Sequence, residues 1–378
     1  MGFPLTKTIP LRLAIVPALV SLFFAAAVLA AAPGPDLLKA KKDAEARGYI
    51  FETSHDDIVA KAKKEGKLRV ITTLEADVVK VAREAFRRKY PFISDFRSEE
   101  LIDVDANQRF LLEIKAGRGK GWDTNRLYTE FYEEYFPHQK KFDILRMAEH
   151  KVLTIPPRLL DPKTPNVVTI SSNMSVIAYN NKLLPADKAP DHWEDFLKPE
   201  FKGRKFVVDI RPISLAVTVP AWGLEKTVDF ARRLAAQDPI WGRGHTKILG
   251  SLAIGENPLF LGPNLGAAIR AQKKDPTGVL GVKIVEAVPT RLHEANGVLN
   301  QAESPYAGLL WLEFLASPEG QKIMDDYWPL GASVFSPGSQ QEQLTKGKKL
   351  SVVDWNHYAK VDDYLNKIVE ALGFPKAK

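Results

Sequence analysis

The chain contains 378 residues, carries a formal net charge of +7 at pH 7 and has no cysteine. Its length exceeds what a single hydrophobic core usually serves, so two lobes are expected. The missing cysteine excludes disulfides and a lipid-bearing cysteine. Nucleic acid is disfavoured as a partner because the basic residues are spread along the chain and form no dense stripe.

Residues 1–32 have the pattern of a secretory signal peptide. Lys7 and Arg12 precede an apolar run over residues 13–29, and small residues suited to cleavage follow it. Pro17 interrupts this run, which is already short for a bilayer span, so a retained membrane anchor is disfavoured. We therefore expect a cleaved signal and a soluble periplasmic protein.

Residues 33–65 are expected to form a helical segment with no chemistry of its own. The first strand is expected at Leu68–Thr72, and a long helix at Asp77–Tyr90. Thr72 and Thr73 lie in the loop between them. Such a loop is a natural ligand-facing edge in an open α/β sheet, but threonine also caps helices, and the residues leave both interpretations open.

The region from about residue 97 to residue 142 is less regular. Ser98 is an ordinary N-cap for a helix expected at Leu101–Ala116. No apolar strand is expected after Asp123. Aromatic residues recur at helical spacing between residues 128 and 142, which favours packing in the core over stacking on a ligand.

The stretch from Thr169 to Ser214 organises the rest of the chain. It places a strand at Met174–Tyr179, a turn, a short amphipathic helix and a second strand in immediate succession. The second strand ends at Asp209, where open α/β sheets bind ligands, and Ser214 opens the next helix. Arg211 either pairs with an anionic solute or forms a pair with Asp209 that fixes the loop, and both interpretations stay open.

The second half alternates helices, loops and strands. A polar loop with Arg243 and His245 precedes a helix, and a short strand leads to Asn264 before the next helix. A strand is expected at Lys283–Ala287, followed by a polar passage over residues 289–297. The remaining helices are expected at the ranges Tyr306–Leu315, from Pro318 onward, and Val361–Leu372.

Several phrases carry a family resemblance. They are Y-N-N-K-L, W-E-D-F-L-K-P-E-F-K-G-R and D-I-R-P in the central stretch, and S-P-E-G-Q downstream. With them, the chain from about Glu65 to Pro337 resembles the periplasmic solute-binding proteins of ABC importers (extracellular solute-binding protein family 1), in the branch that includes the iron(III)-binding proteins. The resemblance implies a type II periplasmic-binding fold, with two α/β lobes, a hinge and a ligand cleft between the lobes.

The resemblance also divides the chain. Residues 66–173 and 296–337 would form the first lobe, residues 174–295 the second, and residues 338–378 a C-terminal helical tail. Such a protein is a monomer that binds a small solute and delivers it to a permease in the inner membrane, with no catalysis and no cofactor. The residues expected to bind the solute are Thr72, Thr73, Arg97, Asp123, Ser172, Asp209, Arg211, Ser214, Arg243, His245 and Asn264.

Iron is the cargo that the resemblance suggests, but the residues argue against it. Iron(III)-binding relatives hold the metal with two adjacent tyrosines in the loop that here reads Gly262-Pro263-Asn264. No metal ligands are therefore expected, and a small anionic solute is favoured over ferric iron. An exported hydrolase or a sensor module remains an alternative, although G-x-S-x-G, S-x-x-K and H-E-x-x-H are all absent from the sequence.

Overall fold

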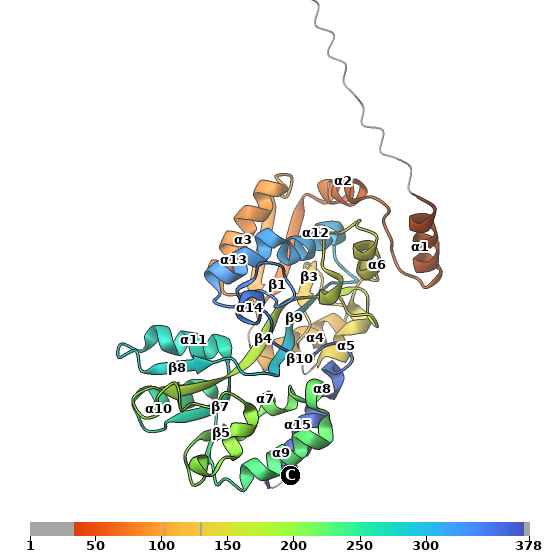
Figure 1. The fold of residues 1–378 in the computed structure, drawn as a ribbon. Helices are drawn as coiled ribbons and strands as arrows, with labels where there is room; N and C mark the ends of the chain where they lie inside the picture. The colour runs from red at the N-terminus through yellow and green to blue at the C-terminus, as the bar shows by residue number, and fades with distance from the viewer. Residues whose placement is uncertain (1–33, 102, 129–130, 374–378) are drawn as a thin grey trace, which may run out of the picture.

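The computed structural model describes residues 34–101, 103–128 and 131–373, so the expected signal peptide lies outside the described residues. Two α/β bodies lie one above the other, and long strands connect them (Figure 1). No helix in the described ranges is both long and apolar enough to cross a membrane.

We call the body that contains the first three strands lobe 1. Its strands are β1 (Lys67–Thr72), β2 (Asp95–Glu100) and β3 (Thr124–Arg126). Its helices are α1 (Pro35–Ala46), α2 (His55–Glu65), α3 (Ala76–Lys89), α4 (Val104–Lys115), α5 (Tyr132–Tyr135), α6 (Ile144–Glu149), α12 (Pro305–Ala316) and α13 (Pro318–Tyr327), with 3-10 turns η2 (Phe136–His138) and η3 (Pro157–Leu159).

The other body is lobe 2. Its strands are β5 (Val207–Asp209), β6 (Ile240–Gly242), β7 (Leu259–Asn264) and β8 (Leu280–Lys283). Its helices are α7 (Ile213–Ala216), α8 (Val219–Trp222), α9 (Leu224–Ala235), α10 (His245–Ala253) and α11 (Leu265–Lys274), with 3-10 turns η4 (Trp193–Leu197) and η5 (Pro199–Phe201).

Two long strands, β4 (Val167–Asn180) and β9 (Val288–Val298), belong to both lobes. The strand order is β2-β1-β3-β9-β4-β7-β5-β6, with β10 (Leu350–Val353) beside β9 and β8 beside β4. β4 pairs with β9 up to Met174 and with β7 and β8 beyond it, with a register shift between Ser175 and Ile177. The change of partner marks the passage from one lobe to the other.

The register shows that the strand ends of the two lobes face each other. β1 and β3 are parallel, and β3 is antiparallel to β9, so the carboxyl ends of β1 and β3 point along β4 toward lobe 2. β7 is antiparallel to β4 and parallel to β5, so the carboxyl ends of β5 and β7 point back toward lobe 1. Ligands bind at such carboxyl ends in α/β sheets.

Helix α12 forms the centre of lobe 1. Each of its residues from Ala307 to Ala316 is buried, which is the environment expected for a helix that is apolar on all sides. The exception in its sequence is Glu313, whose Oε2 lies 2.8 Å from His55 Nε2 and whose Oε1 accepts hydrogen bonds from the backbone and side chain of Thr154. Two elements distant in sequence are thus joined to α12 by one buried carboxylate.

The C-terminal tail departs from the expected helical segment. It contains β10, which extends the pairing of β9, together with α14 (Gln340–Leu344) and the 3-10 turn η6 (Tyr358–Lys360). It ends in α15 (Val361–Ala371), which packs against α7 and α9 of lobe 2. Tyr132 of lobe 1 contacts Trp355 and Tyr358 of the tail, so the tail is a third connection between the lobes.

Three further expectations were wrong. Ser98 lies within β2 and does not cap a helix; Asp103 caps α4 instead and accepts a hydrogen bond from the Ala106 N–H. A strand does follow Asp123, because β3 is held by β1 and β9 on its two sides despite its polar sequence. Residues 289–297, expected as a polar passage, belong to β9.

The pair of His55 and Glu313 in lobe 1 makes the free energy of unfolding depend on pH. The hydrogen bond that the His55 ring donates to Glu313 raises the pKa of His55 above its usual 6.5. Burial favours a higher pKa for Glu313, but the hydrogen bond and charge of His55 leave that pKa lowered. The contribution of the charged pair is therefore present below pH 6.5 and is lost as the pH rises through the raised pKa of His55.

We expect His55→Ala to lower the free energy of unfolding by about 1–3 kcal/mol at pH 6, because it leaves a buried carboxylate with one fewer partner. Urea unfolding should show a smaller loss at pH 8.5. His150→Ala, at an exposed position on the same lobe, is the control. An equal loss for His55→Ala at both pH values would contradict the charged pair.

Candidate functional site

The loops at the end of lobe 2 are joined by Asp209. Its Oδ1 accepts a hydrogen bond of 2.8 Å from the Arg211 N–H, and its Oδ2 accepts one of 2.9 Å from the Gly244 N–H. The buried carboxylate thereby clamps the loop after β5 to the loop after β6. Asp209 makes no ion pair with Arg211 in the described part of the chain, so its contact is with the backbone of that loop.

Asn264 occupies the end of β7 and connects it to two other elements. Its Oδ1 accepts the Ala267 N–H at 3.1 Å and caps α11, while its Nδ2 donates to Asn173 Oδ1 on β4. Its backbone N–H donates to His245 Nδ1 at 3.1 Å. Burial lowers the pKa of His245, so the ring is neutral at pH 7 and carries its proton on Nε2.

Ser214 lies behind this edge. It is buried in α7, and a Cβ at Gly262 would lie 2.1 Å from its Oγ. Gly262 also has a φ of +80°, which other residues rarely adopt. The close approach of α7 to β7 therefore requires glycine at this position.

Three arginines surround this edge without a charged partner. Arg211 and Arg243 are exposed and follow β5 and β6, and Arg291 is half-buried on β9 directly opposite Asn173. Opposite residues of an antiparallel pair point to the same face, so Arg291 lies on the face where Asn173 meets Asn264. Among residues 34–101, 103–128 and 131–373, none of the three arginine side chains forms an ion pair or hydrogen bond.

The facing edge of lobe 1 contains a neutralised cluster. Thr73 Oγ1 donates to Glu294 Oε2, and Arg126 Nε lies 3.2 Å from the same oxygen. His293 Nε2 lies 3.1 Å from Glu294 Oε1. Burial favours a raised pKa for Glu294, but the charge and hydrogen bond of His293 and the charge of Arg126 lower it to about 2. The ring of Tyr128 packs on the guanidinium of Arg126 at 4.7 Å.

The outer part of the lobe 1 edge is acidic. Glu75 and Asp77 begin α3, Glu100 ends β2, and Asp103 begins α4; all four are exposed. A carboxylate at the start of a helix is favoured by the helix dipole, which accounts locally for the positions of Glu75, Asp77 and Asp103 but not for Glu100. Within the part of the chain that the structure describes, these four form no ion pair. The two facing edges thus differ in charge.

Several of the expected binding residues converge on lobe 2, namely Asp209, Arg211, Ser214, Arg243, His245 and Asn264. On lobe 1, Thr73 reaches the crossover strand, while Thr72 is buried and uses its Oγ1 to accept the Leu74 N–H.

The other three expected residues lie elsewhere. Arg97 is in the middle of the edge strand β2, 3.5 Å from Asp95. Burial raises the pKa of Asp123, whose carboxylate accepts the N–H groups of Arg69 and Ser304 away from the facing edge. Ser172 donates to Gln341 of the tail and accepts the Val334 N–H of lobe 1.

Five residues at the facing edges have no signal in the sequence that marks them as neighbours of a site: Asn173, Arg291, Arg126, Tyr128 and Glu294. The pairing of β9 with β4 and β3 places four of them, and Tyr128 lies beside Arg126. The polar content of residues 289–297 by itself favours a loop, and only this pairing makes them a strand.

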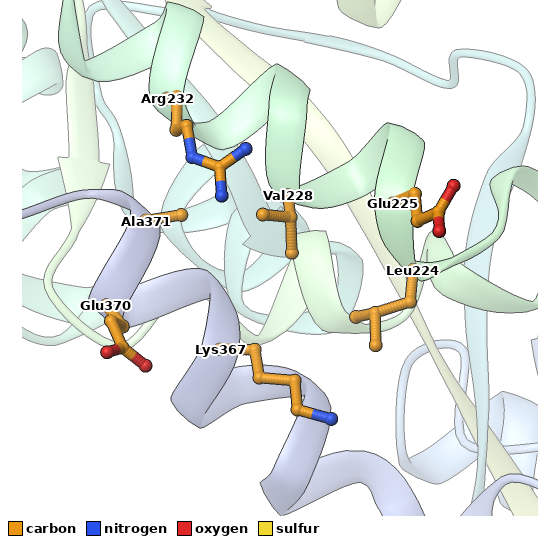
Figure 2. A pocket seen from close by; sticks show the side chains of 7 residues that line it. All are labelled: Leu224, Glu225, Val228, Arg232, Lys367, Glu370 and Ala371. Atoms are coloured by element: carbon orange, nitrogen blue, oxygen red, sulfur yellow. The ribbon is translucent and has the colours of Figure 1, made fainter.

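No group of three or more His, Asp or Glu side chains suited to a metal ion occurs among the residues that the structure describes. A groove of about 580 Å³ lies elsewhere, between α9 and α15, and Leu224, Val228 and Arg232 face Lys367 and Ala371 across it (Figure 2). None of its lining residues comes from the facing strand ends.

The clamp at Asp209 is testable by substitution. Asp209→Ala removes both acceptor oxygens, so the N–H groups of Arg211 and Gly244 both lose their partner, and the free energy of unfolding should fall by about 1–3 kcal/mol for each. Hydrogen exchange should rise in both loops, at residues 210–213 and 243–246. Asp229→Ala, which removes an exposed partner of Arg233 on α9, is the control. If exchange rose in one loop alone, the carboxylate would not be a clamp.

Comparison with solved structures places the fold. Ferric iron-binding protein A of Mannheimia haemolytica, in an open conformation, aligns with a TM-score of 0.63 and 15% identity, over 82% of this chain and 100% of that one. The Bordetella ferric binding protein aligns with a TM-score of 0.61 and 15% identity, over 81% of this chain and 98% of that one. Trichodesmium IdiA (FutA), in complex with iron and citrate, aligns with a TM-score of 0.59 and 18% identity, over 82% of this chain and 100% of that one.

At these identities the likeness establishes the fold, which is the two-lobed type II periplasmic-binding fold. No curated protein matches the chain. A family model described as bacterial extracellular solute-binding protein matches residues 130–361, more than half of the chain, including both crossover strands and all of lobe 2. The chain therefore belongs to the family of bacterial extracellular solute-binding proteins.

Proposed function

We propose that this protein is the periplasmic binding component of an ABC importer, which captures a small anionic solute between its lobes and delivers it to a permease in the inner membrane. The observation that carries the proposal is the set of unpaired arginines at the lobe 2 edge, Arg211, Arg243 and Arg291. Neutral donors accompany them, since His245 presents Nε2–H and Asn264 is fixed by its contacts to β4 and α11. Guanidinium groups recognise carboxylates and phosphates well.

The mechanism is binding and release without catalysis, by a monomer. The lobes meet through β4 and β9, and the lobe boundaries proposed at residues 173/174 and 295/296 lie within these strands. Closure would bring the neutralised cluster of Thr73, Arg126 and Glu294 over a solute held on lobe 2. The solute shifts the population toward the closed form because only that form contacts it from both sides, and the permease would recognise the closed form.

Closure is measurable in solution. Protein purified natively from its own periplasm should carry a resident solute, which native mass spectrometry identifies. Small-angle scattering of the stripped protein should then show a smaller radius of gyration when that solute is added back at saturation. A radius that stays the same at saturation would refute hinge closure.

Ferric iron is the second candidate, supported by the ferric binding proteins among the structural neighbours. The loop where relatives place adjacent tyrosines ends here at Asn264, a neutral residue that is already used as a helix cap. We expect stripped protein titrated with ferric iron to develop no phenolate-to-metal absorption band. Appearance of that band would restore iron as the cargo.

A further inference from the structure

The number and spacing of the unpaired arginines bear on how many charges the solute carries. Asp209 holds the N–H groups of Arg211 and Gly244 on one carboxylate, at 2.8 and 2.9 Å. Arg243 is the residue before Gly244, so the backbones of Arg211 and Arg243 are neighbours. Because its own charge is directed into two backbone donors, Asp209 holds the backbones that carry the two arginines side by side and neutralises neither guanidinium through a direct contact.

Arg291 provides a third cation from a different direction. It projects from the crossover strand beside Asn173, whose side chain is held by Asn264 at the end of β7. Asn264 in turn holds His245, the first residue of α10, and Gly244 before it leads back to Asp209. Strand pairing at Asn173, three hydrogen bonds and the peptide bond between Gly244 and His245 thus link the position of Arg291 to that of the other two arginines.

Closure of the lobes costs free energy unless negative charges pair with the three arginines. Three cations at one edge repel each other, and enclosing them between the lobes removes water that stabilises them. A solute with one negative charge leaves most of this cost in place, whereas one with two or three negative groups offsets it. The neutralised cluster at the lobe 1 edge has no carboxylate free to pair with these arginines. Its carboxylate, Glu294, already contacts Arg126, His293 and Thr73.

We propose that the solute is a polyanion, with at least two separate carboxylate, phosphonate or phosphate groups, one held by Arg211 and Arg243 and another by Arg291. This inference rests on the proposed function and specifies its substrate class. Asp209 is then a positioning residue, which sets the spacing between the two guanidinium groups without contacting the solute.

The competing role for the same arginines lies within the chain. The exposed acids of the lobe 1 edge, Glu75, Asp77, Glu100 and Asp103, lie on the side that faces lobe 2 and form no ion pair among the described residues. If these acids paired with the arginines on closure, the arginines would serve the hinge and the solute would need no particular charge. The two roles predict different responses to solute charge.

The experiment is a calorimetric titration with four probes: butyrate, glutarate, tricarballylate and pyrophosphate. Butyrate carries one carboxylate, glutarate two and tricarballylate three. We expect affinity to rise at least tenfold from butyrate to the best polyanion. Arg211→Gln and Arg243→Gln should each weaken that polyanion at least tenfold and flatten the dependence of affinity on salt concentration.

Arg97→Gln is the matched control, because it removes the same charge from an exposed arginine on the edge strand of lobe 1. It should change affinity less than twofold, and thermal unfolding checks that every variant folds. The inference is overturned if butyrate binds as tightly as the polyanions, if no polyanion of the four binds, or if Arg97→Gln has the same effect as Arg211→Gln.

Failure of this inference is distinguishable from failure of the proposed function. A resident solute that closes the lobes but carries one charge or none would contradict the polyanionic substrate class. It would leave the role as the binding component of an importer in place. In that case Arg211→Gln should alter the radius of gyration of the solute-free protein, as a hinge contact would. A protein that binds no solute and never closes would contradict both.

Discussion

The antiparallel pairing of β4 with β9 is the constraint on which the rest of the structure depends. It runs from the Val167–Gly297 pair to the Met174–Thr290 pair and is shared by both lobes. Because every other strand is ordered outward from this pair, its direction decides that the carboxyl ends of both half-sheets face each other. The facing loops, their charges and the hinge all follow from one ladder of backbone hydrogen bonds.

The two facing edges have different electrostatic designs. Lobe 1 presents a buried cluster whose charges are balanced internally around Glu294, surrounded by exposed acids. Lobe 2 presents unpaired arginines around a framework of amide, imidazole and carboxylate groups that are fixed by hydrogen bonds to the backbone or, for Asn173 and Asn264, to each other. On our proposal, an anion arriving between the lobes would be attracted to lobe 2 first, and lobe 1 would complete its enclosure. Capture and closure would then have separate structural bases.

The sequence predicted the α/β class, the family and most helices, because apolar spacing and capping residues are local signals. Six of the eleven residues that it predicts to bind the solute lie at the lobe 2 edge, because they follow strands of that lobe, and their contact with a solute stays a prediction. It missed β9, whose polar residues are strand only because β4 and β3 pair with them.

The alternation of side chains along strand β4 explains why the sequence predicts Ser172 as a binding residue and not Asn173. Ser172 and Asn173 are both polar neighbours on β4, but successive residues of a strand point to opposite faces. Asn173 therefore meets Asn264 at the site, whereas Ser172 is held by Gln341 of the tail. Which of two adjacent polar residues faces a ligand depends on a register that the sequence does not reveal. Arg97 illustrates the same limit, since β2 extends to Glu100 and leaves it in mid-strand.

We propose that the solute binds between the facing strand ends, against lobe 2. A crystal structure of the protein with the resident solute retained from its own periplasm would show its position directly. We expect electron density for that solute between β5, β6 and β7 on one side and Thr73 on the other, with guanidinium nitrogens of Arg211 or Arg243 within hydrogen-bond distance. Density for the solute only in the groove between α9 and α15, with the strand ends empty, would contradict it.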